Sequence, residues 1–240
     1  SFALDNFTWE EERRRNEARI NELAYYDQLT GLANRPLLTD RIRQAVAVGM
    51  RTDKFSALLF IDLDRFKTIN DTLGHAHGDN LLKQVGQRLL AIVPADDTVA
   101  RFGGDEFVLL LHGLSGNSEE AAEAVALVCR KILTAVREPI LLEGITCNCT
   151  ASIGVALFGK QSITPDELLK QADLAMYQAK DAGRNTVRFF DPAMQQTVME
   201  RIELERDLEE AIRLEQFVLY YQPLISVDDT VFGAEALIRW

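Results

Sequence analysis

Two consecutive glycines followed by two acids separate two apolar runs near the middle of the chain. The segment 101–107 has apolar residues before it and the run 108–111 after it. This pattern predicts a β-hairpin whose tip carries the adjacent carboxylates of Asp105 and Glu106. Two neighbouring acids repel each other unless a cation or solvent relieves them. From this segment alone, a solvated acidic turn and a functional turn are equally open.

The run 55–63 is almost continuously apolar and predicts a buried central strand. Asp62 lies at the C-terminal end of this strand, and Asp64 lies just beyond it. If the hairpin lies beside this strand, the two acidic pairs converge. Hard cations such as Mg²⁺ take oxygen ligands and are usually held by one or two carboxylates together with substrate phosphates.

The other elements follow from apolar spacing and turn residues. A short helix is expected after Asp64, and Glu143 and Gly144 are expected to join two paired strands. Cys147 and Cys149 would face one side of the second of these strands. The remaining helices have apolar faces within residues 38–46, 81–92, 125–136 and 168–179, and the strands cover residues 139–142, 146–158 and 186–190.

Charged residues dominate the first 25 positions and predict an exposed connector helix. This helix is either a solvated single helix or a coiled coil that connects an upstream sensor to the domain. A charged helix and two strands are expected after a boundary near residue 191. Two strands do not make a stable unit alone, so they indicate part of a larger domain. The expected organisation is a connector at 1–25, a main domain at 26–190, a linker helix at 191–216 and a domain fragment at 217–240.

Composition narrows the class of protein. The chain has 240 residues, of which 47% are hydrophobic and 26% are charged, as is typical of globular proteins. The net charge of −11 argues against nucleic acid as a partner. No run approaches the roughly 20 apolar residues of a membrane span, and no signal peptide is visible. With three cysteines, these features favour a cytoplasmic domain and leave open whether a larger parent protein is membrane-attached.

Several polar residues have both a functional and a structural interpretation. Lys180 and Arg184 lie four residues apart across a helix end, where they either remain solvated or bind a phosphate tail. Structural roles, in packing or in fixing loops, are favoured for five residues: His75, His77, His112, Thr30 and Asn34.

The order of five motifs identifies a resemblance. The chain resembles the GGDEF domain, the diguanylate cyclase family, over roughly residues 25–190. The naming motif is unchanged, and four further blocks accompany it in order. The five blocks are DQLTGLANR at 27–35, DLDRFKTIND at 62–71, GHAHGD at 74–79, GGDEF at 103–107 and ADLAMYQAKDAGRN at 172–185.

The resemblance implies an α+β, palm-like fold with a mostly antiparallel sheet flanked by helices, similar to nucleotide cyclases. It implies condensation of two GTP into cyclic di-GMP in a homodimer, with Mg²⁺, or Mn²⁺ in its place, as cofactor. The implied metal ligands are Asp62, the carbonyl of Leu63, Asp105 and Glu106. The implied substrate contacts are Asn70 and Asp79 to guanine, Lys180 and Arg184 to the terminal phosphates, Gly103 and Gly104 through close backbone approach, and Phe66 and Lys67 beside the phosphate end.

Two departures from the family pattern affect function. Many members carry an inhibitory Arg-x-x-Asp product site, but Pro94 stands at its Arg position here and Asp97 at its Asp position, so product inhibition is expected to be weak or lost. The tail resembles the opening of an EAL domain, the cyclic di-GMP phosphodiesterase family, with Gln222, Glu235 and Arg239 at its motif positions. About 25 residues of that roughly 250-residue barrel would not support phosphodiesterase activity.

Three functions compete at this point. The main domain is an active diguanylate cyclase, or a non-catalytic GTP-binding domain that regulates a C-terminal EAL phosphodiesterase, or a dimerisation scaffold. The intact acids, guanine-binding pair and phosphate pair disfavour the scaffold. The same residues serve binding and catalysis, so they favour cyclase activity without excluding the regulatory function.

Overall fold

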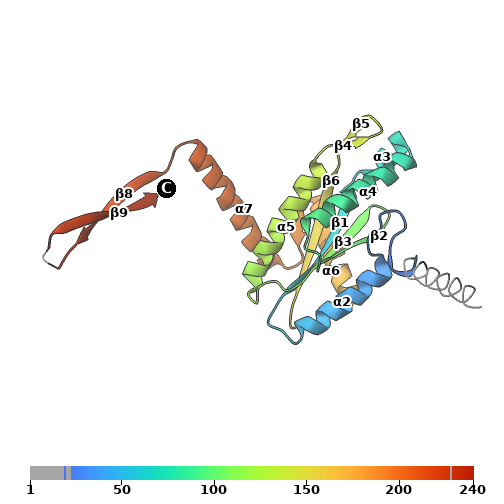
Figure 1. Cartoon of the computed structure of the whole chain (residues 1–240), viewed down its shortest axis with the longest axis horizontal. Coiled ribbons are helices and arrows are strands. Elements are labelled where there is room, and N and C mark those ends of the chain that lie inside the picture. Colours follow the sequence, from blue (N-terminus) through green and yellow to red (C-terminus); the bar gives the residue numbers. More distant parts are fainter. Residues whose placement is uncertain (1–18, 20–22, 228) are drawn as a thin grey trace, which may run out of the picture. The chain divides into compact units, whose positions relative to one another are not determined.

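The computed structural model describes Arg19 and residues 23–240, except residue 228 (Figure 1). The expected connector helix at 1–25 lies almost wholly outside the described residues. The chain divides into two compact units, Ser1–Gln195 and Gln196–Trp240. None of the helices in the described part is long and apolar enough to cross a membrane.

The first unit is built on a five-stranded sheet with the strand order β2-β3-β1-β6-β7. All nine residues of the central strand β1 are buried, as its apolar run predicts. Only the β6–β7 pair is parallel, so the sheet is mostly antiparallel, as expected. The bounds are β1 Ser56–Asp64, β2 Thr98–Gly103, β3 Glu106–Leu111, β6 Thr150–Phe158 and β7 Val187–Phe189.

Five helices flank this sheet, which makes the fold α+β (Figure 1). Their bounds are α2 Arg35–Gly49, α3 Phe66–Leu73, α4 His75–Ile92, α5 Ser118–Arg137 and α6 Pro165–Asp181. Helix α6 begins with a capping box, in which Thr164 Oγ1 accepts from the backbone N–H of Glu167 and the Glu167 carboxylate accepts from the backbone N–H of Thr164. The residues Thr164 and Glu167 therefore fix the start of this helix.

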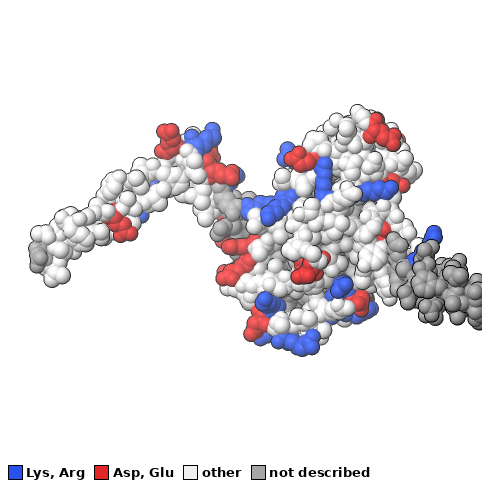
Figure 2. Space-filling model, viewed as in Figure 1, with Lys and Arg blue, Asp and Glu red and all other residues white. Residues whose placement is uncertain are grey.

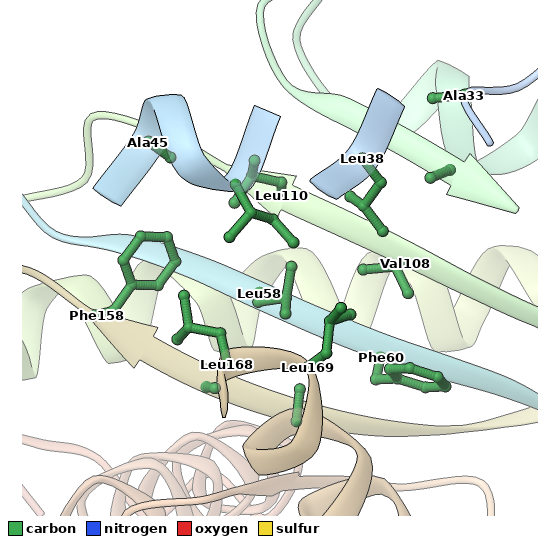
Figure 3. Close-up of a cluster of buried hydrophobic side chains, with 14 of the residues drawn as sticks. Ala33, Leu38, Ala45, Leu58, Phe60, Val108, Leu110, Phe158, Leu168 and Leu169 are labelled. Carbon is green, nitrogen blue, oxygen red and sulfur yellow. The ribbon is translucent and has the colours of Figure 1, made fainter. Parts of the chain in front are cut away.

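The core on one face of the sheet joins helices α2 and α6 (Figure 3). Leu38 and Ile42 of α2 and Leu168 of α6 pack with Leu58 and Phe60 of β1. Side chains alternate between faces along a strand, so Asp62 and Asp64 project from β1 on the same face as Leu58 and Phe60. This apolar layer fixes the strand end that carries the acids. Helices α4 and α5 pack against each other and belong to the opposite layer.

One predicted strand is wrong. The run 146–158 is two strands, because β5 (Ile145–Cys147) pairs with β4 (Ile140–Leu142) in a separate sheet, whereas β6 pairs with β1 from Thr150 onward. Cys147 and Cys149 therefore do not share a strand, although both are buried. The predicted turn at Glu143 and Gly144 is confirmed, and both residues have positive φ, as a tight hairpin turn requires. Asp64 is the last residue of β1 rather than the residue beyond it.

Helix α7 (Pro192–Arg213) crosses from the first unit into the second. The second unit also contains the antiparallel strands β8 (Val218–Ile225) and β9 (Val231–Arg239), at the expected places. Its strands expose large apolar side chains such as Tyr220, Tyr221 and Phe232. Figure 2 shows this hairpin as an almost uncharged surface.

Candidate functional site

The hairpin tip lies beside the end of the central strand. Strand β3 pairs with β1 so that Glu106 lies opposite Asp62, and the backbone N–H of Leu63 donates to the carbonyl oxygen of Asp105 at 3.3 Å. Gly104 takes a φ of 48°, a conformation that glycine adopts without strain. The sequence predicted that the two acidic pairs converge only if the hairpin lies beside the central strand. The register of β1 and β3 shows that it does.

Electrostatics at the tip disfavour several ionised carboxylates without a cation. Burial raises the pKa of Asp62, and the neighbouring Asp105 raises it further, although a hydrogen bond from Lys180 opposes the change. Burial likewise raises the pKa of Glu106, with Asp62 and Asp105 adding to the effect. The pKa values of Asp62 and Glu106 are thus both raised, and a bound cation would favour the ionised form of these two carboxylates.

Lys180 meets one of these acids directly. Its Nζ lies 2.7 Å from Asp62 Oδ2, and the two side chains are only 26% and 11% exposed. The resemblance assigned Lys180 to a phosphate, but here its ammonium group compensates a carboxylate. Arg184 makes no such contact and lies in a separate pocket beside Asp64. The two residues that the resemblance assigned to the terminal phosphates therefore lie in two neighbouring places.

The donor set fits Mg²⁺ held jointly with a substrate. In the described part of the chain, no three acidic, histidine or cysteine side chains are gathered closely enough to enclose a cation by themselves. Mg²⁺ keeps several ligands from water and phosphate and needs only one or two protein carboxylates. Asp62, Asp105 and Glu106 could supply such carboxylate oxygens beside the backbone of Leu63, so these residues fit that requirement.

The two expected guanine contacts lie on consecutive helices. Asn70 is in α3, and Asp79 is exposed near the start of α4. Asn70 Oδ1 is buried and has no hydrogen-bond partner among the described residues. An unsatisfied buried acceptor costs about 1–3 kcal/mol, so it indicates a place for an incoming N–H donor. Phe66 and Gly78 border this amide group.

An arginine absent from the predicted site holds the hairpin tip. Arg101 Nη1 lies 3.2 Å from both carboxylate oxygens of Asp27, and its Nε and Nη2 donate to the carbonyl of Gly104 at 3.0 and 2.8 Å. Thr30 also donates to Asp27 through its backbone N–H and hydroxyl. Burial alone would raise the pKa of Asp27, but the hydrogen bonds from Thr30 and Arg101 hold it below the ordinary value. Motif residues 27–30 and 101–104 thus form one hydrogen-bonded unit.

Asp64 has a structural role in the same region. Its carboxylate accepts hydrogen bonds from Thr150 Oγ1 and Ser152 Oγ, each at 2.7 Å, and from the backbone N–H of Asn185 at 3.1 Å. Sequence spacing gave no signal for this network, because its donors come from residues about 90 and 120 positions away. The network holds the loop after α6 against the end of β1.

Four of the five residues expected to have structural roles make contacts of that kind: Thr30, Asn34, His77 and His112. Asn34 accepts from the backbone N–H of Leu37 and so caps α2. The backbone N–H of His112 donates to Asp97 Oδ1 at 2.9 Å. His77 Nε2 lies 3.7 Å from a carboxylate oxygen of Glu143. None of these contacts draws the residue into the acidic site.

Curated proteins similar to the chain include two from Pseudomonas aeruginosa. MucR, a bifunctional diguanylate cyclase/cyclic di-GMP phosphodiesterase, is 42% identical over 227 residues, which is 94% of this chain and 32% of MucR. NbdA, a cyclic di-GMP phosphodiesterase, is 38% identical over 93% of this chain and 28% of its own length. The chain thus spans about a third of the length of these relatives.

Solved structures show the same fold. The GGDEF domain of YfiN from Pseudomonas aeruginosa is 38% identical with a TM-score of 0.62, covering 67% of this chain and 97% of that one. The coiled coil and GGDEF domain of DgcB from Caulobacter crescentus, in complex with c-di-GMP, is 28% identical with a TM-score of 0.69, covering 78% and 96%. The family model described as diguanylate cyclase, GGDEF domain, matches residues 24–186. This match covers more than half of the sequence, and the chain therefore belongs to the GGDEF domain family.

Proposed function

We propose that the first unit is a diguanylate cyclase that condenses two GTP into cyclic di-GMP and two pyrophosphates. The observation that carries this proposal is the register of β1 and β3, which brings Asp62, Leu63, Asp105 and Glu106 to one end of the sheet. A solvated acidic turn would not need a buried partner carboxylate, yet Asp62 is buried directly opposite Glu106.

Different residues around the hairpin tip bind the guanine base, the phosphates and the metal ion of the bound GTP. Asn70 and Asp79 bind the guanine edge, whose N1–H and N2–H₂ groups are donors that suit the unpaired oxygen of Asn70. A Cβ at Gly103 or Gly104 would meet no atom within 4 Å, so the backbone here is open to a nucleotide. The metal ligands would hold Mg²⁺, which lowers the pKa of a bound hydroxyl and neutralises phosphate charge.

Lys180 lies where its ammonium group can contact both the carboxylate of Asp62 and the phosphates of bound GTP. Its ammonium group holds Asp62 in the structure, and it lies on the last turn of α6, next to the loop that carries Arg184. With substrate present, the same ammonium group neutralises charge on the phosphates. Phe66 and Lys67, the first two residues of helix α3, are assigned to the phosphate end of the same nucleotide.

A homodimer completes the reaction. One site holds one GTP, so its 3′-hydroxyl oxygen must attack the α-phosphate of a second GTP held by another copy of the chain. The new O3′–phosphorus bond replaces the bond to pyrophosphate, and a second identical step closes the ring. Two-fold symmetry with the hairpins facing each other provides both steps with the same residues.

A regulatory function is the alternative. NbdA and PdeR, the latter from Escherichia coli and 37% identical over 95% of this chain, are both named cyclic di-GMP phosphodiesterases. Matches to such relatives extend beyond residue 186, where the family match ends. We propose that residues 217–240 begin an EAL domain and that an upstream sensor precedes the first unit. The first unit would then bind GTP and control that phosphodiesterase.

Incubation of the purified chain with GTP and Mg²⁺, followed by chromatography of the nucleotides, separates the two functions. The cyclase proposal expects cyclic di-GMP and pyrophosphate, and Asp105→Ala should abolish both. Bound GTP without cyclic product would favour the regulatory function. Cyclic product from Asp105→Ala would contradict the metal-ligand assignment.

A further inference from the structure

A second polar pocket lies next to the acidic site. It has a volume of about 700 Å³ and is bordered by the start of α3, the end of α5, the loop before β6 and the loop after α6. Its charged lining residues are Asp64, Arg65, Arg137 and Arg184. Three arginines from three separate parts of the sequence thus line the same pocket as one aspartate.

Nothing in the described part of the chain pairs with these arginines. No ion pair or side-chain hydrogen bond joins Arg65, Arg137 or Arg184 to another described residue, and the oxygens of Asp64 are already occupied by Thr150, Ser152 and the backbone of Asn185. Three unpaired positive charges around one pocket contrast with a chain of net charge −11. Arginine presents a planar fork of donors that suits phosphate oxygens. The pocket therefore has the character of an anion site.

The backbone of the pocket supports this interpretation. Arg65, Arg184 and Asn185 have φ values of 59°, 67° and 48°, and they are three of the six non-glycine residues with positive φ in the described chain. Such conformations cost about 1–3 kcal/mol each and cluster at functional sites. A surface that merely solvates arginines would not need this strain at three lining positions.

The position of the pocket indicates which anion enters. Asp64 follows Asp62 by two residues on the same face of β1, which places the two about 7 Å apart. Lys180 contacts Asp62, and Arg184 follows it after the end of α6. If the α-phosphate of a nucleotide lies at the acidic site, the phosphates that follow it can therefore reach the pocket lined by Arg65, Arg137 and Arg184.

We propose that Arg65 and Arg137 join Arg184 in holding the terminal phosphate of bound GTP, so that this pocket selects a nucleoside triphosphate over a diphosphate. The inference rests on the proposed function, because it assigns the phosphate tail of the same nucleotide. Arg65 is the N-cap residue of α3, and Arg137 is the last residue of α5, so the two guanidinium groups reach the pocket from different helices.

Calorimetric titration with 3′-deoxy-GTP and with GDP tests the proposal. The 3′-deoxy nucleotide lacks the attacking hydroxyl, so binding is measured without turnover. Arg65→Gln and Arg137→Gln should each weaken 3′-deoxy-GTP binding about fivefold to tenfold, since a charge-assisted hydrogen bond is lost, while GDP binding changes less than twofold. Arg43→Gln, on helix α2 away from the pocket, is the matched control and should change neither affinity.

The outcomes separate the inference from the proposed function. Unchanged 3′-deoxy-GTP affinity in the double variant, or equal losses for both nucleotides, would overturn the inference. Pyrophosphate binding that the double variant loses, with intact nucleotide binding, would make the pocket a product site and also overturn it. Failure of the unmodified chain to bind 3′-deoxy-GTP overturns both, whereas binding without any cyclic product from GTP refutes only the cyclase. Thermal melting of each variant establishes that it is folded.

Discussion

Gly78→Ala should uncouple nucleotide binding from stability. Gly78 lies in α4 against the side chain of Asn70. A Cβ added here would lie 1.8 Å from Asn70 Oδ1, 2.9 Å from its Cγ and 3.2 Å from Phe66 Cζ. The first distance is far below any tolerated contact, so the amide of Asn70 must rotate away from its present place.

The expected magnitudes follow from what Asn70 touches. Its Oδ1 has no hydrogen-bond partner in the described chain, so rotation breaks no internal hydrogen bond at that atom. Alanine also favours a helix over glycine by up to about 1 kcal/mol, which offsets part of the strain. Loss of the amide's contact with guanine should cost about 1–3 kcal/mol, which corresponds to a roughly 5- to 150-fold weaker affinity for GTP.

Isothermal titration with 3′-deoxy-GTP, together with thermal melting, measures both effects. Gly86→Ala is the matched control, because it lies in the same helix. Its Cβ would lie 3.1 Å from Leu32 Cδ1 and 3.7 Å from Leu32 Cγ and Thr30 Cβ, and none of these nearest atoms belongs to Asn70. The control should keep its affinity. An unchanged affinity in Gly78→Ala would refute the assignment of Asn70 to guanine, and equal losses in both variants would show a general effect on α4.

Three further predictions concern the acids. Glu106→Gln should abolish cyclase activity. It should also raise the Tm at pH 7, because burial raises the pKa of Glu106 and makes its ionised form unfavourable in the folded protein. This gain in Tm should shrink as the pH falls through the folded pKa of Glu106. Asp27→Asn should lower the stability by about 1–3 kcal/mol at pH 7 through loss of the ion pair with Arg101. Because the folded pKa of Asp27 is depressed, this difference in stability should begin to shrink only below the ordinary carboxyl pKa of 3.8 and should disappear once the pH falls below the folded pKa. Cyclic di-GMP should bind Asp97 weakly or not at all, because that carboxylate already accepts from the backbone of His112; a titration showing tight binding that Asp97→Ala removes would contradict this.

Periodicity predicted the elements whose neighbours are apolar. All residues of β1 are buried, so its sequence is an almost continuous apolar run that is recognisable without any structure. The α6 start was equally predictable, because its capping box lies within four consecutive residues. In contrast, the break at Asn148 and Cys149 was missed, since apolar residues continue across it while the hydrogen-bonding partner changes from β4 to β1.

The resemblance named Asp62, Asp105 and Glu106 as one group of metal ligands, but the contacts around them could not be predicted from the sequence. Spacing could not show that Lys180 pairs with Asp62, because the two are far apart in sequence and meet only when α6 packs on the sheet. Long-range charge pairs depend on tertiary structure, whereas helix caps and turns depend on nearby residues.

The contacts of Arg101 connect the first motif, residues 27–35, to the hairpin tip. Ala33 lies beside β2, where its N–H donates to Val99 and its carbonyl accepts from the N–H of Arg101. The same arginine then joins Asp27 to the carbonyl of Gly104 at the hairpin tip. A displacement of the segment 25–34 must therefore either break these bonds or carry β2 and the hairpin tip with it. Since Asp105 follows Gly104 directly, such a movement changes its alignment with Asp62, and the entry of the chain into this domain is mechanically coupled to the proposed metal ligands.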